Sequence, residues 1–284
     1  MLEKLTFKNH INERIDFGDG GLYVNYNDLH DYQWNHSDSG DRIRKFSRGI
    51  QSRSIPVVIF CNSEKEGLLL KNRLMEYADK DVLAQQYGRL ILNGYYMNCY
   101  IVGSKKSGYL WDKGYMKATL SIITDHPQWI KESTVSFRAD GRDIKNGENI
   151  VASGQKRNLD YNYDFPFDYM SFMLRKTLNN TGFTETNFRL IIYGAAVNPA
   201  IHIGNHKYQV NCTIQDGEYL TVDSLAKTIV LTKHDGTAEN HFNDRSRDSY
   251  IFKPISAGNN TVTWNKTFGF DVVILEERSE PKWI

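Results

Sequence analysis

The 284-residue chain has little cysteine, little proline and no long apolar run. Its three cysteines, Cys61, Cys99 and Cys212, leave one over from any pairing and lack the close spacing of a zinc site. We therefore expect free thiols in a reducing compartment. The mean hydropathy is −0.54, and no stretch approaches the length of a membrane span. Residues 1–9 alternate between apolar and polar, which predicts a first strand and not a signal peptide.

An excess of charge of one sign is also missing. Lys and Arg total 35 and Asp and Glu total 34, so the formal net charge is +1. Such a chain has no overall field that would attract nucleic acid, anionic lipid or an acidic substrate. We expect neither sequence-specific nucleic-acid binding nor membrane insertion, and partners must be recognised by shape. The aromatic share of 13% favours pleated sheets and interface anchors.

The first half of the chain contains short strand-like runs separated by turns, over residues 5–62. One of them is a β-branched run over residues 55–60, with Pro56 near its start, where a strand tolerates proline. Residues 27–48 interrupt these runs, because they are mostly polar and charged with isolated aromatics. This segment is predicted to be a long loop or a projecting arm.

A helix and a hairpin follow. Ser63 and Glu66 form a capping box that predicts a helix from about 64 to 79. Four residues at helical spacing predict its buried face: Gly67, Leu70, Leu74 and Tyr77. Asn93-Gly94 between two apolar runs is a strong hairpin signal. One helix packed on an antiparallel sheet accounts for an N-terminal domain over residues 1–135.

An aromatic and aspartate seam over residues 159–170, interrupted by Pro166, predicts a hinge, because proline can neither continue a helix nor sit in mid-sheet. From Phe188 onward many short strands follow, with a tight turn at Gly204-Asn205. This spacing is typical of a β-sandwich or jelly roll. The predicted fold class is therefore mainly β with two domains, the second over residues 136–276 and including the seam.

Few residues suggest chemistry. His202 and His206 are four apart, but a hairpin at Gly204-Asn205 would place His206 opposite Ile203, and further metal ligands are not evident. His234-Asp235 is better explained as a turn beside a strand end than as an acid–base pair. No nucleophile elbow, paired-carboxylate motif or phosphate loop is present. We expect no enzyme, no metal and no cofactor.

Two glycine-rich segments, residues 18–21 and 103–108, are predicted to be turns. Small basic clusters could contact nucleic acid, although solvated loops explain them better at this net charge: Lys105 and Lys106, and Arg42, Arg44, Lys45 and Arg48.

Several motifs occur in a particular order along nearly the whole chain. They lie at residues 81–84, 87–96, 114–116, 125–129, 160–169 and 279–283. In this order they resemble the distal tail proteins of long-tailed, non-contractile bacteriophages. The resemblance implies that the second domain is a galectin-like β-sandwich. It also implies that a C-terminal tail over about 277–284 returns to the first domain.

The resemblance further implies a structural role at the tip of a phage tail. The first domain would form a six-membered ring, a hub that joins the tail tube to tip or baseplate proteins used in host adsorption and DNA passage. Its partners would be further copies of itself, the tail tube protein, the tail-tip protein and, as candidates, receptor-binding proteins. The protein would be made in the bacterial cytoplasm and end in the virion. Residues 27–48 and 103–113 are the expected contact elements.

An alternative function remains open at this point. The chain could be a carbohydrate-binding accessory protein that recognises host cell-wall sugars through its sandwich. The residue types that sugar sites use are present: Trp264, His202, His206, Asn211 and Arg245. However, Trp264 alternates with Val262, which predicts that both face the core.

Overall fold

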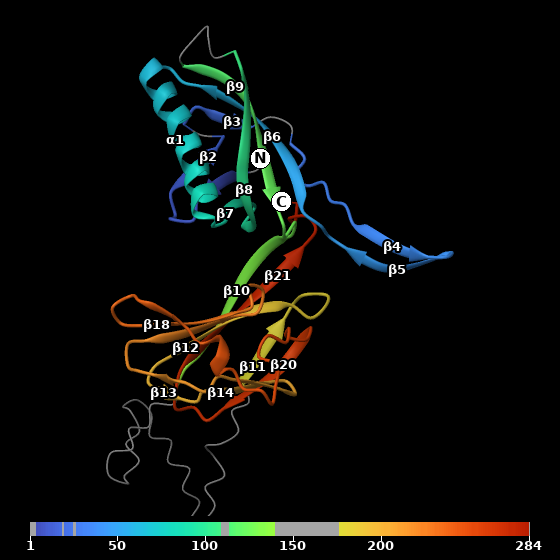
Figure 1. The fold of residues 1–284 in the computed structure, drawn as a ribbon, viewed down its shortest axis with the longest axis vertical. Coiled ribbons are helices and arrows are strands. Elements are labelled where there is room, and N and C mark those ends of the chain that lie inside the picture. Colours follow the sequence, from blue (N-terminus) through green and yellow to red (C-terminus); the bar gives the residue numbers. More distant parts are fainter. Residues whose placement is uncertain (1–3, 19, 25–26, 109–113, 140–175, 284) are drawn as a thin grey trace, which may run out of the picture. The chain divides into compact units, whose positions relative to one another are not determined.

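The computed structural model describes residues 4–18, 20–24, 27–108, 114–139 and 176–283 (Figure 1). The predicted hinge at 159–170 lies outside these residues. The chain divides into two compact units, Met1–Lys131 with Glu277–Ile284, and Glu132–Glu276. Strands predominate in both units, so the predicted mainly β class is confirmed. No helix in the described part of the chain is long and apolar enough to cross a membrane.

In the first unit, antiparallel strands pair in the order β2–β1–β7–β8–β9–β6–β3. Their bounds are β1 Leu5–Lys8, β2 Arg14–Phe17, β3 Leu22–Val24, β6 Gln51–Phe60, β7 Gly88–Leu92, β8 Tyr95–Ser107 and β9 Tyr115–Thr124. The long strand β8 pairs with β7 through its first half and with β9 through its second half. The enclosed core includes Phe7, Leu90, Met97, Leu120 and Trp129.

The sequence predicts a hairpin at Asn93-Gly94 and a strand with Pro56 near its start. Asn93 and Gly94 adopt positive φ of 52° and 79° between Leu92 and Tyr95, as a two-residue hairpin turn requires, so the hairpin is confirmed. Pro56, in contrast, lies in the middle of β6 and not near a strand start. Among the described residues, β3 pairs only with Val57–Ile59, so no strand faces Pro56 on that side and its missing N–H is tolerated there.

The α-helix of the first unit, α1, spans Glu64–Ala84. Its predicted start is confirmed, because the Ser63 hydroxyl accepts a hydrogen bond from the Glu66 N–H at 3.3 Å. The predicted face is confirmed too, since Gly67 and Leu74 are buried and Leu70 and Tyr77 pack against the core.

The predicted end of this helix near residue 79 is wrong. The helix continues to Ala84, and Gln85 closes it in a left-handed conformation with φ of 52°. Its last turn is held by a long-range contact, because the fully buried Asp81 carboxylate contacts His10 through the backbone N–H at 2.8 Å and the ring Nδ1 at 2.6 Å. The local sequence gives no sign of that contact.

Gly88 offers a test of the packing between α1 and β7. A Cβ atom at this position would lie 2.2 Å from Oδ2 of Asp81 and 2.8 Å from the ring of Phe7. Gly88→Ala is therefore expected to lower the free energy of unfolding by about 1–3 kcal/mol, as overpacking does. The matched control is Gly103→Ala, where the nearest atom is Cβ of Ser121 at an ordinary 3.5 Å. Equal urea midpoints for the two variants would contradict the expected clash.

Within the described residues, the second unit contains two larger antiparallel sheets and the short pair β13–β16. One has the strand order β19–β18–β17–β12–β21 and the other β11–β20–β14–β15. Their bounds are β11 Lys176–Asn180, β12 Asn187–Tyr193, β14 Ala200–Ile203, β15 His206–Gln209, β17 Tyr219–Asp223, β18 Thr228–Thr232, β19 Ala238–Asn240, β20 Gly258–Trp264 and β21 Phe270–Arg278. The remaining elements are the nine-residue strand β10 Trp129–Phe137, which the unit boundary divides, β13 Ala196–Val197, β16 Thr213–Ile214 and the 3₁₀ helix η1 Phe242–Asp244. Side chains from both sheets share one core, which is the predicted β-sandwich.

Candidate assembly interface

The first unit carries a β-hairpin that contributes no residue to its hydrophobic core. Strands β4 Asn35–Ser39 and β5 Arg42–Ser47 pair only with each other in the described chain, and all their residues are exposed. Gly40, with φ of 62°, lies in the connecting turn. We call residues 35–47 the arm; Figure 1 shows it standing clear of the other strands of its unit. The prediction of a loop or arm over residues 27–48 thus corresponds to an exposed β-hairpin.

The arm and its flanks present large apolar side chains to solvent. These are Tyr32, Trp34, Ile43, Phe46 and Ile50, between 43% and 76% exposed. Basic side chains lie among them on β5, at Arg42, Arg44 and Lys45. An isolated two-stranded hairpin is only marginally stable in water. A cluster of exposed apolar residues on such an element indicates a surface that another protein covers.

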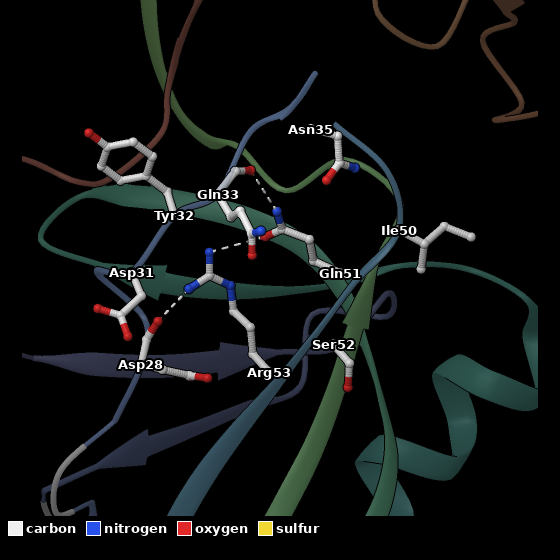
Figure 2. A pocket seen from close by; sticks show the side chains of 9 residues that line it. All are labelled: Asp28, Asp31, Tyr32, Gln33, Asn35, Ile50, Gln51, Ser52 and Arg53. Carbon is white, nitrogen blue, oxygen red and sulfur yellow. Dashed lines mark hydrogen bonds between the residues drawn. The ribbon is translucent and has the colours of Figure 1, made fainter. Parts of the chain in front are cut away.

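The root of the arm is built by side chains that bind backbone groups. Arg53 is 5% exposed and donates hydrogen bonds to the Asp28 carbonyl and, at 3.4 Å, to Oε1 of Gln51. Gln51 in turn donates to the Gln33 carbonyl at 3.1 Å (Figure 2). Burial lowers the pKa of Arg53, while the carboxylates of Asp28 and Asp31 oppose that shift. These bonds hold the chain that leads into the arm.

A buried contact fixes the same segment to the core. Leu29 and Trp129 are both fully buried, and the indole Nε1 of Trp129 donates to the Leu29 carbonyl at 3.2 Å. The segment therefore has both an apolar anchor and polar anchors before the arm begins.

The chain that leaves the arm is held by residues from the end of the sequence. The Arg48 guanidinium donates to the Pro127 carbonyl at 3.2 Å and to Oγ of Ser279 at 2.6 Å, and it stacks 3.8 Å from the Trp34 ring. Burial lowers the pKa of Arg48, opposed by the charge of Glu277. Trp283 stacks on His30 with ring centroids 3.9 Å apart. Both flanks of the arm are thus anchored.

A polar pocket of about 410 Å³ lies at this root. Figure 2 shows its lining: Asp28, Asp31, Tyr32, Gln33, Asn35, Ile50, Gln51, Ser52 and Arg53. It contains carboxylates, carboxamides and a guanidinium, but no nucleophile beside a general base. The arrangement can hold polar groups of a partner; it has no evident means of catalysis.

The sugar-site candidates do not converge. His206 lies opposite Ile203, as the hairpin predicted. Trp264 packs at 5.1 Å on the Phe270 ring, and its Nε1 donates to the Phe268 carbonyl at 3.0 Å, so its prediction as a core residue is confirmed. His202 is exposed next along the strand from the buried Ile201, which pairs with Trp264, and so points to the opposite face.

The other two sugar-site candidates lie near each other, because the Asn211 N–H donates to the carbonyl of Asp244, the neighbour of Arg245. Asn211 accepts from Gln209, and Arg245 stacks 4.1 Å from the Phe242 ring. No group of three or more His, Cys, Asp or Glu side chains that could hold a metal ion occurs among the described residues.

Two of the remaining sequence candidates resolve into ordinary structure. The segment Gly103–Ser107, predicted to be loop, is strand: it extends β8 and pairs with β9 through Lys105 and Lys106. That prediction is wrong because the long β9 strand supplies a full ladder partner; residues 109–113 lie outside the described chain. Asp235 accepts from the backbone N–H and the hydroxyl of Thr237 within a turn, which agrees with the turn predicted there.

Arg53 is a residue of this site that none of the sequence patterns above predicts. A signal was available, because Arg53 shares the inward-facing parity of Ile55 and Val57 in β6. A charged residue at a core-facing position needs hydrogen-bonding partners. For Arg53 these partners are the Asp28 carbonyl and the Gln51 side chain, both at the root of the arm.

These features define a class of protein: two β-rich units, the first of which carries helix α1 and an anchored, exposed arm. Solved structures that share its fold include the following three. A chain from the phage P2 baseplate in its activated conformation with calcium is 15% identical, with a TM-score of 0.65, covering 99% of this chain and 100% of that one. The strontium form of the same baseplate gives 14% identity and a TM-score of 0.65, with the same coverage. The Dit protein of phage SPP1, described as a paradigm of the hub adsorption apparatus in phages that infect Gram-positive bacteria, is 11% identical, with a TM-score of 0.53, covering 96% and 99%.

No protein-family model and no curated protein matches the chain significantly. At identities of 11–15% the structural likeness shows the fold. The fold is that of phage baseplate and hub components over nearly the full length, which agrees with the resemblance to distal tail proteins seen in the sequence.

Proposed function

We propose that this protein is a structural hub of a phage tail tip. It forms a ring, six-membered by the resemblance, that joins the tail tube to tip or baseplate proteins used in host adsorption and DNA passage. Its fold supports this role because it matches baseplate and hub components over at least 96% of the chain. The protein would act in the virion, and its second unit would be a separate domain projecting from the ring.

The observation that carries the proposal is the arm. A closed ring needs contacts between two unlike surfaces of each copy. The arm supplies one such surface, since residues 35–47 are fully exposed, carry apolar and basic side chains, and are anchored at both flanks. An element with these properties stays ordered for docking on a neighbouring copy while contributing nothing to its own core.

We propose no catalytic role and no sugar site. The catalytic candidates resolve into turns, and Trp264 packs into the sandwich core. Of the remaining candidates, His202 and His206 lie on opposite faces of their hairpin, while Asn211 and Arg245 lie near each other.

The deciding measurement is the mass of the purified protein in solution by light scattering, with negative-stain imaging of the main peak. The expected result is rings of about six times the 32.9 kDa chain mass. The same measurement is repeated after mixing with the tail tube and tail-tip proteins, because a partner can nucleate the ring. A protein that stays monomeric alone and in every mixture would overturn the proposal.

A further inference from the structure

Three cationic residues form one row across the sheet of the first unit. Lys8 on β1 lies directly opposite Arg14 on β2 and directly opposite Arg89 on β7. Asn98 on β8 continues the row beside Arg89. Like charges directly opposite each other on neighbouring strands destabilise a sheet. This row therefore has a cost in the isolated protein that a bound anion would offset.

The three cations differ in their partners. Arg14 is paired, because its Nε and Nη2 donate to Oδ1 of Asp16 at 2.8 and 2.7 Å. Within the described chain, neither Lys8 nor Arg89 forms an ion pair with a carboxylate. The Arg89 guanidinium instead lies 4.4 Å from the Tyr96 ring centroid. A stacked guanidinium keeps its N–H donors at the ring edge for another acceptor.

Lys8 and Arg89 line one pocket of about 430 Å³. Carboxamide side chains surround them, among them Asn12, Gln86 and Asn98, and the lining contains no carboxylate. The nearby carboxylate of Asp81 is fully buried and engaged with His10. The pocket thus combines positive charge with directional amide donors, and nothing in its lining neutralises that charge.

We infer that this pocket binds the carboxylates of an acidic peptide segment from a protein partner. Neighbouring strands are about 4.8 Å apart, so the Lys8 and Arg89 side chains can converge on one carboxylate. Charge-assisted hydrogen bonds to a carboxylate are the strong kind, and the carboxamides can orient it or the adjoining peptide groups. The site shares no lining residue with the pocket at the arm root.

The surroundings favour a short acidic peptide over nucleic acid. Each strand of duplex DNA presents a charge about every 3.4 Å along its axis and is held by an extended track of cations. Of the three cations in the row, Lys8 and Arg89 lack carboxylate partners within the described chain. The carboxylates of Asp16 and Glu13 lie beside the row. Those carboxylates would repel a polyanion that runs past the pocket, whereas a short segment can enter without meeting them.

The test uses the full chain and a fluorescein-labelled hexaglutamate peptide, with binding followed by fluorescence anisotropy. The double variant Lys8→Gln with Arg89→Gln is expected to weaken binding at least about tenfold, because it removes both charge-assisted contacts. The matched control, Lys117→Gln with Arg73→Gln, removes the same charge from exposed positions outside the pocket and is expected to bind like the unmodified protein. Binding should weaken as salt is added.

A charge-retaining variant guards against misfolding as the explanation. Lys8→Arg with Arg89→Lys keeps both cations and is expected to retain most of the affinity, and circular dichroism verifies the fold of each variant. Three results would overturn the inference: no binding of the peptide, equal loss in the pocket and control variants, or tighter binding of a 12-base-pair duplex DNA through Lys8 and Arg89.

Discussion

Deleting the arm is expected to convert the proposed ring into a folded monomer. Replacing residues 35–47 by a short Gly-Ser turn joins Trp34 to Arg48, whose chain neighbours Asn35 and Ser47 are paired in the arm. All the deleted residues are exposed and none belongs to the core, so the melting temperature should change little. Light scattering measures the loss of the ring, and circular dichroism measures the fold.

A milder pair of variants separates the arm's side chains from its backbone. Ile43→Ser with Phe46→Ser removes two apolar side chains that are 58% and 60% exposed. It is expected to weaken ring formation at least about tenfold, because buried aromatic and aliphatic anchors carry most of the energy of an interface. Phe183→Ser with Val197→Ser, at positions 90% and 69% exposed in the second unit, is the matched control. Intact rings from the arm-deleted protein would show that the arm is not the contact between copies.

Features set by local chemistry could be predicted from the sequence. Asn93-Gly94 and Gly204-Asn205 both close two-residue hairpins, because Asn93, Gly94 and Gly204 can adopt the positive φ that such turns require. Ser63 starts the helix because its hydroxyl satisfies a backbone N–H that the helix leaves unpaired. In each case the physical cause lies within a few residues of the feature, so one sequence is enough to identify it.

Features set by contacts between distant residues could not be predicted. The helix outlasts its predicted end because Asp81 is bound by His10, from a different part of the chain. The arm strands were missed because the alternation of apolar and polar residues that identifies a strand needs one buried face, and both faces of the arm are exposed.

The pocket lined by Lys8 and Arg89 could not be predicted for the same reason. Arg14, Lys8 and Arg89 are unremarkable as single charges in a chain whose net charge is +1. Only the strand register brings them into one row, and a register shift of one residue would turn Lys8 to the other face of the sheet. Sites of this kind depend on pairing that no local pattern reveals.

Trp129→Ala is expected to lower the free energy of unfolding of the first unit by about 3–5 kcal/mol, the usual cost of truncating a buried aromatic side chain to alanine. Trp129 is fully buried and also donates a hydrogen bond to Leu29, so the variant loses both the packing and the anchor of the arm root. Urea denaturation measures the change. The control is Trp34→Ala, because Trp34 is 43% exposed and its loss should cost far less. Similar midpoints for the two alanine variants would contradict the role of Trp129 as the anchor.

Trp129→Phe separates the two roles of this residue. It keeps an aromatic ring in the core but removes the N–H, so the Leu29 carbonyl loses its donor at a cost of about 1–3 kcal/mol. If the arm must be held in one direction to meet a neighbouring copy, this variant should remain folded at 25 °C and yet form fewer rings at a given concentration. Rings as stable as those of the unmodified protein would show instead that Arg53 and Arg48 alone hold the root, since their hydrogen bonds to Asp28 and Pro127 do not depend on the indole.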